Sequence, residues 1–392
     1  MAWLGEEIGA ATAGALAPRC VKDVIEEKLF DRRRDLFTDL SLVFMDTTSL
    51  SFYGAGGKTL GRRGYSKDYR PDPAQMVLAL VVDVTGRPIC TEMVPGNTAD
   101  ISVLLPIVDR LASRFGITRA CVVADRGMIS AATIAALEAR GLEYILGAQE
   151  RSSSDVRDVV LNDPAAMIPL ALDRQRGETP LWVKEVKVGD ARYIVTRNEA
   201  EAAKERADRQ AIIDGLQTQL QKGDKALVGN SAYRRYLRKA GKGQAFEIDA
   251  GKLADEARFD GISVIRTNAK ITPLQAVIRY RDLLEVEALF RAAKATFDTR
   301  PIFHQSDAAI RGHVFCSFLA LVLAKELGGL CEDKGFKPEW QPLLNDLDRL
   351  QQASIEKDGK RIAIRTPTPG KVGAVFQAAG IALPDNIAEM AA

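Results

Sequence analysis

Two aspartates in this sequence stand directly after short apolar runs. Asp46 follows the run 42–45, and Asp125 follows the run 121–124. Each run predicts a buried strand that ends at its aspartate. If these strands are neighbours in one sheet, they lie about 4.8 Å apart. Two carboxylates so close repel, and each tends to hold a proton unless a divalent cation neutralises the pair. We therefore expect Asp46 and Asp125 to share a metal site.

A third carboxylate, Glu287, lies in a segment that predicts a helix over residues 273–295. Tyr280 and Lys294 each lie seven residues from Glu287, and seven residues fall only about 20° short of two helical turns. Arg291 follows one turn beyond Glu287, on nearly the same face. An acid flanked by an aromatic hydroxyl and two cations suits a group that meets both a metal ion and a phosphate.

These residue types fit metal-assisted cleavage of a phosphodiester. Mg²⁺ takes oxygen ligands in octahedral geometry and keeps waters and substrate phosphate oxygens in its shell. Two Mg²⁺ ions held by the three carboxylates could activate an attacking water or 3′-hydroxyl and stabilise the departing oxygen of an in-line displacement. Mn²⁺ could substitute for Mg²⁺. In this arrangement Arg126, Arg291 and Lys294 would contact phosphates.

Each of these residues also has a purely structural explanation. An aspartate at a strand end is often a turn former or a helix cap, and this explanation is favoured for Asp46 alone because two threonines follow it. Asp125 could likewise mark a simple junction between strand and loop. Glu287 and Arg291 have the i,i+4 spacing of an ion pair that surface helices use routinely. Only the combination of the three acids favours a metal site.

The expected elements around these residues alternate between strands and helices. A charged amphipathic helix over 21–37 precedes the first strand, a long loop over 47–70 and a hairpin of strands over 76–82 and 89–94. A helix that Gly116 closes, the second strand, a helix over 131–140 and a strand over 144–146 follow, and later come a strand over 262–265 and helices over 273–295 and 308–327. This order predicts an α/β fold with a mixed sheet flanked by helices, and it is the order of the ribonuclease H-like fold.

We divide the chain into five segments. Residues 1–40 form an N-terminal lead-in helix, residues 41–147 and 262–328 form two parts of one ribonuclease H-like domain, and residues 329–392 form a tail with a hairpin at 357–360. Residues 148–261 form a β-rich and helical insertion between the second aspartate and the glutamate. In this insertion the runs 181–186 and 191–195 alternate like a solvent-facing hairpin, and residues 199–220 predict a heavily charged helix.

The composition is that of an ordinary soluble globular protein, with 46% hydrophobic and 27% charged residues. The longest apolar run, near residues 315–323, is too short for a bilayer span, and the first residues lack the basic region of a signal peptide. We therefore expect a cytoplasmic protein with no membrane partner. Five cysteines without C-x-x-C spacing favour buried free thiols. His304 and His313 fit no common helical zinc motif, so we assign them to packing or polar support.

A net charge of only +2 does not by itself indicate a nucleic-acid binder, so a DNA-binding surface would need segregated cations. One candidate is Lys67 in the loop over 47–70. The other is a basic cluster around Tyr233 and Tyr236 in the insertion, a composition suited to a DNA backbone. Its members are Lys222, Lys225, Arg234, Arg235, Arg238, Lys239 and Lys242. A solvated basic face explains the same composition.

Several segments together resemble the DDE transposases of bacterial insertion sequences, in the group related to insertion sequence four. The helix carries that group's pattern of Tyr280, Glu287 and Lys294 with six residues in each interval, while Leu283 stands where the group usually has an arginine. Further matching segments are residues 64–68, 95–100, 124–128, 266–268, 300–304 and 312–315. The resemblance extends from about residue 22 to the end. It implies a ribonuclease H-like fold, a β-rich insertion, magnesium as the cofactor and the three carboxylates as the catalytic, metal-binding triad.

The resemblance implies an enzyme that nicks DNA at the inverted-repeat ends of an insertion sequence and joins the 3′-hydroxyl to target DNA, as a homodimer on paired ends. Family members usually carry a long N-terminal region that recognises the ends. We expect this region to be missing here, because the first catalytic strand begins near Ser41. The alternatives are an inactive DNA-binding remnant and a standalone nuclease of the same fold. Strand transfer on oligonucleotides that carry the ends discriminates between them.

Overall fold

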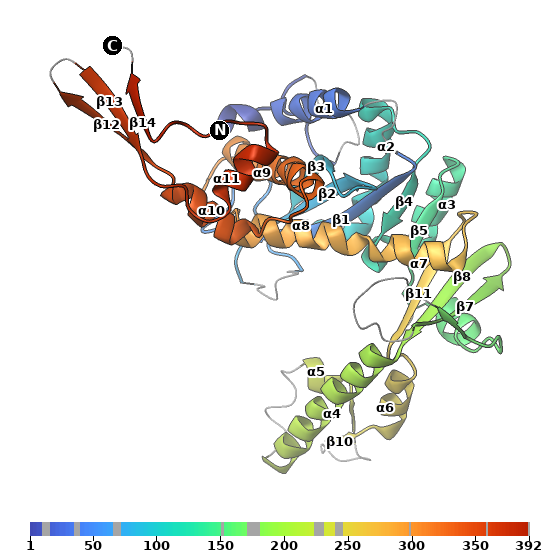
Figure 1. Ribbon diagram of the computed structural model, residues 1–392. Coiled ribbons are helices and arrows are strands. Elements are labelled where there is room, and N and C mark those ends of the chain that lie inside the picture. Colours follow the sequence, from blue (N-terminus) through green and yellow to red (C-terminus); the bar gives the residue numbers. More distant parts are fainter. Residues whose placement is uncertain are drawn as a thin grey trace. The chain divides into compact units, whose positions relative to one another are not determined.

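The computed structural model describes residues 1–9, 16–34, 40–65, 72–149, 153–170, 181–222, 231–239, 246–297, 299–357 and 360–390. The chain divides into two compact units, and both contain strands and helices (Figure 1). Unit 1 comprises Met1–Ile117 and Leu284–Ala392, and unit 2 comprises Thr118–Leu283. The fold class is therefore the mixed α/β class that the sequence predicts. The division into five segments stays a prediction.

The strands near the start of unit 1 form an antiparallel meander in the order β3-β2-β1. β1 spans Leu42–Ser51, β2 spans Gln75–Asp83 and β3 spans Pro88–Pro95, and nearly all of their residues are buried. The predicted hairpin between β2 and β3 is confirmed. In its turn the Asp83 carboxylate accepts the backbone N–H groups of Thr85 at 2.8 Å and Arg87 at 2.9 Å, and Gly86 has a φ of 75°.

β1 is longer than the sequence predicts. The apolar run 42–45 predicts a strand that ends at Asp46, but β1 continues to Ser51. It continues because β2 supplies a partner at every position, from Val43 opposite Asp83 to Ser51 opposite Gln75. The polar residues after Asp46 therefore belong to the strand, and the expected loop over 47–70 begins later. Asp46 lies in the middle of β1, opposite Leu80.

Some helices of unit 1 were predicted with different ends, whereas its two short 3-10 helices and its last two helices were not predicted. The helices of this unit are η1 (Ala2–Gly5), α1 (Val21–Arg33), η2 (Asp100–Ser102), α2 (Leu104–Phe115), α8 (Leu283–Ala295, most of which lies in this unit), α9 (Asp307–Asp333), α10 (Trp340–Arg349) and α11 (Val372–Ala378). α1 ends at Arg33 rather than at residue 37, and residues 35–39 lie outside the described ranges. Gly116 ends α2 with a φ of 66°, as predicted.

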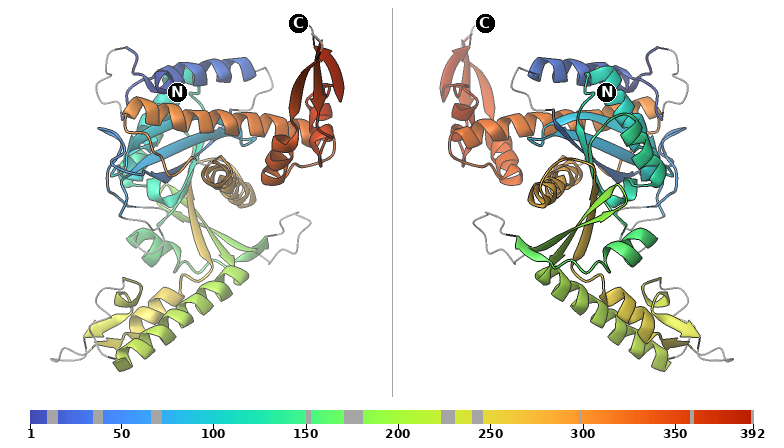
Figure 2. Two further views of the ribbon diagram at one scale, coloured as in Figure 1. Left: turned by 90° about the vertical axis from the view of Figure 1, so that its left-hand side faces the viewer. Right: turned by 90° about the vertical axis from the view of Figure 1, so that its right-hand side faces the viewer.

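α9 is longer than the predicted helix over 308–327, and it contacts β3 within unit 1 (Figure 2). Ser306 caps its first turn by accepting the backbone N–H of Ala309 at 3.3 Å. By length and composition α9 could cross a membrane, contrary to the expectation from the apolar run alone, and 39% of its most apolar window is buried inside the protein. Core helices of soluble proteins meet the same criterion, so α9 is weak evidence for a membrane span.

The C-terminal part of unit 1 forms a small layer of its own. β12 (Gln352–Lys357) and β13 (Lys360–Arg365) form the hairpin that the sequence predicts, and β14 (Ile387–Met390) pairs with β13 (Figure 1). Cys331 at the end of α9 packs with Leu343 of α10 and Val372 of α11 in a separate apolar cluster. These residues bury one another, so the predicted tail has its own core.

The strands of unit 2 form one mixed sheet in the order β4-β5-β11-β8-β7-β6. They are β4 (Cys121–Ala124), β5 (Tyr144–Gly147), β6 (Ile168–Leu170), β7 (Leu181–Val188), β8 (Ala191–Asn198) and β11 (Ile262–Thr267). β4 and β5 are parallel and α3 (Ala131–Ala139) connects them, while the other pairs are antiparallel. The predicted hairpin of β7 and β8 therefore extends the sheet of β4 and β5 through β11.

A helical lobe projects from this sheet between β8 and β11 (Figure 1). The lobe comprises α4 (Glu199–Lys222), α5 (Ser231–Arg234), β9 (Leu237–Lys239), β10 (Phe246–Ile248) and α6 (Ala250–Ala257). Leu216 and Tyr236 are nearly inaccessible in its own apolar cluster. Its two ends meet in the sheet, where the backbone N–H of Asn198 donates to the Gly261 carbonyl oxygen at 2.9 Å. The lobe therefore leaves and re-enters the sheet at one place.

The helix predicted over 273–295 is two helices, α7 (Pro273–Arg281) in unit 2 and α8. α7 begins as predicted, because Thr272 accepts the backbone N–H of Gln275 at 3.2 Å. Asp282 lies between the helices with φ −64° and ψ −15°, and its N–H is shared between the carbonyl oxygens of Ile278 and Tyr280. The seven-residue interval from Tyr280 to Glu287 thus spans a helix junction.

A buried charge cluster fixes α1 to β3 within unit 1. Lys22, Asp23 and Glu26 of α1 are each at most 3% exposed. The Lys22 ammonium donates to Asp23 at 2.8 Å and lies 3.5 Å from Glu26. The backbone N–H and the hydroxyl of Thr91 in β3 both donate to Glu26, at 3.0 and 2.6 Å. Because an unpaired buried charge is very costly, these contacts must form together when α1 docks.

The two carboxyls of this cluster contribute to stability with opposite dependence on pH. Burial raises the pKa of Glu26 to about 7, and the nearby Lys22 ammonium only partly offsets that effect. Burial also acts to raise the pKa of Asp23, but the charge and hydrogen bond of Lys22 outweigh it and hold that pKa below its usual value. The Glu26 contribution to stability is therefore present at low pH and lost as pH rises through about 7. The Asp23 contribution is present near neutral pH and lost in acid.

Replacing Glu26 by glutamine tests the first of these contributions. We expect the free energy of unfolding of the native sequence to fall between pH 5 and pH 8, because ionisation of Glu26 opposes burial. Glu26→Gln cannot ionise at this position, so its unfolding free energy should change less over the same window. Denaturant titrations at a series of pH values measure both slopes. Glu332→Gln, at an exposed position of α9, should keep the native slope, and an unchanged slope in Glu26→Gln would contradict the assignment.

Candidate active site

Asp46 lies in the middle of β1, in unit 1, and is only 9% exposed. One of its carboxylate oxygens accepts the backbone N–H of Thr47 at 2.7 Å. The Thr47 hydroxyl in turn donates to the Asp100 carboxylate at 2.8 Å, at the start of η2. β1 is therefore braced beside Asp46 by a second acid. The alternative explanation of Asp46 as a turn former or helix cap is wrong, because both of its neighbours continue the strand.

Asp100 is a residue that the site prediction missed. It lies in the segment 95–100 that carries part of the family resemblance, and that match was the available signal. Asp100 is partly exposed and comes from a short loop between β3 and α2, so no apolar periodicity points to it. Its contact with Thr47 makes it a positioning residue for the strand that carries Asp46.

Asp125 directly follows β4 in unit 2, as the sequence predicts. It is half-buried, and its backbone carbonyl accepts the N–H of Met128 at 3.0 Å in the turn η3 (Arg126–Met128). The hydroxyl of Tyr280, from α7, donates to Asp125 Oδ1 at 3.1 Å. The structure thus brings together two of the predicted site residues that lie 155 positions apart in the chain. The bond engages one carboxylate oxygen, Oδ1, and so orients the carboxylate.

Gly147, at the end of β5, makes room for this contact. A Cβ atom at position 147 would lie 2.2 Å from the Tyr280 hydroxyl oxygen and 3.0 Å from the backbone nitrogen of Arg126. The first distance is too short for any side chain and the second is tight, so glycine serves here for space rather than for backbone conformation. Sequence analysis also missed Gly147, because a glycine at a strand end has many ordinary explanations.

Glu287 lies on the exposed side of α8. Val286, Phe290 and Ala293 form the buried stripe of this helix in unit 1, at spacings of four and three residues. Arg291 is exposed like Glu287, and Lys294 is half-buried. The predicted polar face of Glu287, Arg291 and Lys294 is therefore compatible with the way α8 packs.

Two leucines of this region differ in their burial. Leu284 is apolar, yet it is 57% exposed. It falls on the outer side of α8 because the buried stripe is set by Val286 and Phe290. Leu283, which replaces the arginine usual at this point of the family pattern, is buried. A buried leucine packs and makes no phosphate contact, so position 283 contributes no cation to the site.

The matching segment 266–268 has a structural task in unit 2. Asn268 accepts the backbone N–H of Tyr144 at 2.8 Å and donates to the Leu142 carbonyl at 3.1 Å. The Thr267 hydroxyl donates to the Tyr144 carbonyl at 2.6 Å. These bonds hold the start of β5 against β11, and β5 carries Gly147. The segment therefore supports the site without lining it.

The remaining predicted DNA contacts differ in their exposure and in the contacts described for them. Arg126, Arg234 and Arg235 are exposed, and the Arg235 guanidinium carbon lies 4.6 Å from the ring centre of Tyr236. Arg238 is exposed but pairs with Glu247 at 2.7 Å, and this ion pair weakens its attraction for a phosphate. Lys67 lies outside the described ranges, as do residues 225 and 242 of the predicted basic cluster.

The two histidines pack against each other, and the five cysteines are free thiols, as the sequence predicts. The ring centres of His304 and His313 lie 5.2 Å apart, and His313 Nε2 lies 3.2 Å from the Thr299 carbonyl oxygen. Burial lowers the pKa of His313, which favours a neutral, supporting ring. All five cysteines are free thiols; four are buried and Cys316 is partly exposed.

A comparison with known protein families matches residues 38–323 to the transposase DDE domain. The matched region covers most of the chain and contains Asp46, Asp125 and Glu287. The chain belongs to this family. A comparison with curated proteins finds no match. The function of this DDE transposase domain is therefore of the transposase type, which involves DNA, and its mixed α/β fold agrees with that family's ribonuclease H-like fold.

DDE transposases generally use divalent metal ions, and the donor set here fits such an ion. Carboxylate oxygens are the hard ligands that Mg²⁺ and Mn²⁺ prefer. Asp125 offers Oδ2 because Tyr280 engages Oδ1. Within the ranges that the structure describes, no three His, Cys, Asp or Glu side chains are grouped as a metal site. Asp46 and Glu287 belong to unit 1 and Asp125 belongs to unit 2, and the convergence of the three acids on metal ions stays a prediction.

The space at position 147 can be tested by a double-mutant cycle. Gly147→Ala should displace the Tyr280 hydroxyl and break its bond to Asp125, and hydrogen bonds to charged groups contribute about 1.5–3 kcal/mol. Tyr280→Phe removes the same bond and also the atom that clashes. We therefore expect Gly147→Ala to cost much less stability in the Tyr280→Phe background than alone. Thermal and denaturant unfolding of the four proteins measure this difference.

Gly329→Ala is the matched control for this cycle. Gly329 lies within α9, nothing lies within 4 Å of a Cβ at that position, and alanine is the better helix former. This variant should be neutral or slightly stabilising in both backgrounds. Additive effects of Gly147→Ala and Tyr280→Phe would show that position 147 does not act through the tyrosine.

Proposed function

We propose that this chain is a transposase of the group related to insertion sequence four, which cuts DNA at the ends of an insertion sequence and joins them to target DNA. The observation that carries the proposal is the hydrogen bond from Tyr280 to Asp125. It links the first residue of the Tyr, Glu and Lys pattern to the aspartate after β4. Sequence analysis selected these two residues on separate grounds, and their contact supports a common site.

In this proposal Asp46, Asp125 and Glu287 hold two Mg²⁺ ions, for which Mn²⁺ can substitute. When bound, the ions supply Lewis acidity that lowers the pKa of an attacking water or hydroxyl and stabilises the departing oxygen. Tyr280 keeps the Asp125 carboxylate in one orientation, so Oδ2 is presented without a search over rotamers. Asp100 and Thr47 hold the backbone beside Asp46 in the same way.

Both proposed steps are in-line displacements at phosphorus. In the first, a water oxygen bonds to phosphorus, the bond from phosphorus to the 3′-oxygen breaks, and that oxygen leaves as a 3′-hydroxyl after taking a proton. In the second, this hydroxyl loses its proton and attacks a phosphodiester of target DNA, from which another 3′-hydroxyl departs. The number of phosphodiester bonds is conserved in the second step, so no external energy source is required.

The cations around the carboxylates have the proposed task of binding the DNA backbone. Arg291 and Lys294 on α8 and Arg126 after Asp125 would neutralise phosphates near the reacting group. Arg234, Arg235 and Arg238 on the helical lobe, with Lys67, would hold DNA farther from the reaction. Arg238 should contribute least of the lobe residues because Glu247 already pairs with it. Such contacts weaken as salt rises.

We further propose that two copies of the chain act together on paired ends in the cytoplasm. Each copy would contribute its own triad, and the segment 148–261 would serve as the insertion that engages DNA. Strand cleavage without transfer in the assay below would favour a nuclease instead. Binding without cleavage would favour a DNA-binding protein.

Removal of any one carboxylate should abolish most of the activity. We expect Asp125→Asn and Glu287→Gln each to lower the rate of Mg²⁺-dependent cleavage of inverted-repeat oligonucleotides by about 100-fold or more, because metal ions supply several kcal/mol of transition-state stabilisation. DNA affinity in gel shifts should change far less. Single-turnover cleavage and strand-transfer assays with labelled ends measure both steps.

Glu285→Gln is the matched control for this experiment. Glu285 is an exposed glutamate on the same helix as Glu287, two positions earlier. Its replacement removes the same charge from α8 without touching the triad, so cleavage should stay within about threefold of the native rate. Equal rates in the native protein and in Glu287→Gln would rule out catalysis by this glutamate.

A further inference from the structure

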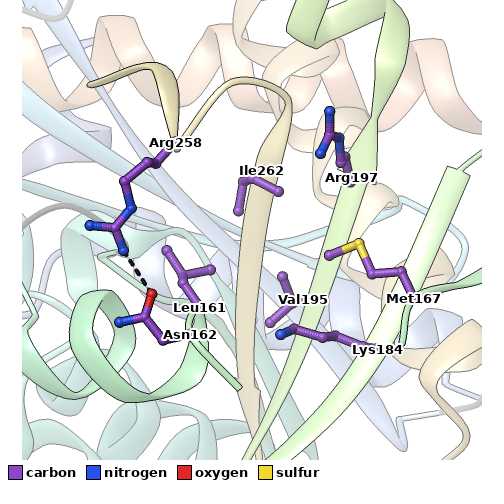
Figure 3. Close-up of a pocket in the computed structure, with 8 residues that line it drawn as sticks. All are labelled: Leu161, Asn162, Met167, Lys184, Val195, Arg197, Arg258 and Ile262. Carbon is purple, nitrogen blue, oxygen red and sulfur yellow. Dashed lines mark hydrogen bonds between the residues drawn. The ribbon is translucent and has the colours of Figure 1, made fainter. Parts of the chain in front are cut away.

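A cavity of about 290 Å³ opens in unit 2 beside β7, β8 and β11 (Figure 3). Val195 and Ile262 form its floor, and Leu161 and Met167 supply apolar sides. All four side chains belong to, or pack against, the apolar cluster of this part of unit 2. The cavity therefore lies against a packed apolar cluster, and neighbouring strands hold its lining in place.

Three cationic side chains reach this cavity from three different elements: Lys184 from β7, Arg197 from β8 and Arg258 from the end of α6. Figure 3 shows the two guanidinium groups on either side of Ile262 and the Lys184 ammonium beside Val195. The lining residues that the structure describes include no carboxylate. Like charges that converge on an apolar surface repel one another unless an anion lies between them.

Two of these cations are held only by neutral oxygens in the part of the chain that the structure describes. The Lys184 ammonium is 8% exposed and donates to the Asp163 backbone carbonyl at 2.7 Å. Arg258 donates to the Asn162 side-chain oxygen at 2.9 Å. Arg197 differs, since it pairs with Glu199 at 2.8 Å. Carbonyl oxygens satisfy hydrogen bonds without neutralising the positive charge. The Asp158 carboxylate interacts electrostatically with Arg258 but lies outside the cavity lining, so the lining itself favours an anionic ligand.

We propose that this cavity binds a nucleoside monophosphate, with the phosphate among the three cations and the base or sugar against Met167 and Leu161. The apolar sides distinguish this ligand from a bare phosphate, and the cations distinguish it from an uncharged nucleoside. A volume of about 290 Å³ is at the lower end for small-molecule sites and excludes duplex DNA. The ligand is therefore a free nucleotide or one unpaired nucleotide of a strand. The choice of a nucleotide among amphipathic anions rests on the proposed function.

Calorimetric titration of the full chain with thymidine 5′-monophosphate tests this inference. The native protein should bind the nucleotide more tightly than it binds thymidine or inorganic phosphate. Arg258→Gln and Arg197→Gln should each weaken nucleotide binding about tenfold or more, since each removes a charged hydrogen-bond donor. Lys187→Gln is the matched control, because Lys187 is exposed on the same strand as Lys184 and does not line the cavity. It should bind like the native protein.

Two further arms identify the source of the nucleotide. Competition by single-stranded oligothymidylate, but not by a blunt duplex, assigns the cavity to an unpaired nucleotide of DNA. Binding of the monophosphate without such competition assigns it to a free nucleotide. No detectable binding, equal binding by Arg258→Gln, or inorganic phosphate binding as tight as that of the nucleotide would overturn the proposal.

The readout is independent of catalysis. Asp125→Asn should bind the monophosphate like the native protein, because Asp125 does not line the cavity. If the native protein fails to cleave DNA but binds the nucleotide through Arg197 and Arg258, the proposed function fails and this inference stands. If cleavage proceeds and the nucleotide does not bind, only this inference fails.

Discussion

The hydrogen bond from Tyr280 to Asp125 forms because position 147 carries no side chain. Three elements of unit 2 meet at this point: the end of β5, the turn after β4 and α7. Each approaches so closely that one methyl group would separate them. The start of β5 is fixed in turn by Thr267 and Asn268 after β11. The position of the second aspartate thus depends on packing across the sheet, and local sequence around Asp125 does not determine it.

Buried charges in other parts of the chain likewise require partners in defined positions. In unit 1, Lys22 holds Asp23 and lies close to Glu26 inside the protein. In unit 2, Arg209 of α4 makes two bonds to Asp260, at 2.5 and 2.6 Å, and so ties the helical lobe to the end of its own segment. In each case a charge that has left water is matched by a partner with defined geometry. The cavity beside β8 differs, because its lining includes three cations and no acid, although Arg197 pairs with Glu199 outside the lining.

The sequence predicts most of the elements because apolar periodicity is strong in them. The strand before Asp125, the helix that ends at Gly116 and the hairpin of β2 and β3 follow from patterns within about ten residues. The extension of β1 past Asp46 could not be predicted, because polar residues remain in the strand only through pairing with β2. The break at Asp282 is equally hidden, since the flanking residues favour one continuous helix.

The sequence predicts which residue types form the site, but it predicts only some of the contacts between them. Tyr280 was selected for its spacing from Glu287, and its bond to Asp125 required the fold. Gly147, Asp100 and Thr47 were missed because each acts through a neighbour that is distant in the chain. Spacing along one helix is visible in a sequence, whereas an approach between a strand end and a tyrosine 133 positions later is not.

The helical lobe begins and ends at one hydrogen-bonded pair of residues, Asn198 and Gly261. Because β8 and β11 pair directly beside this point, a short turn could close the sheet in place of the lobe. The lobe also has its own apolar cluster, so its sequence can drift without disturbing the strands beneath it. The lobe could therefore be exchanged as a unit. Over evolutionary time the lobe could be replaced by another one while the sheet that positions Asp125 is inherited unchanged.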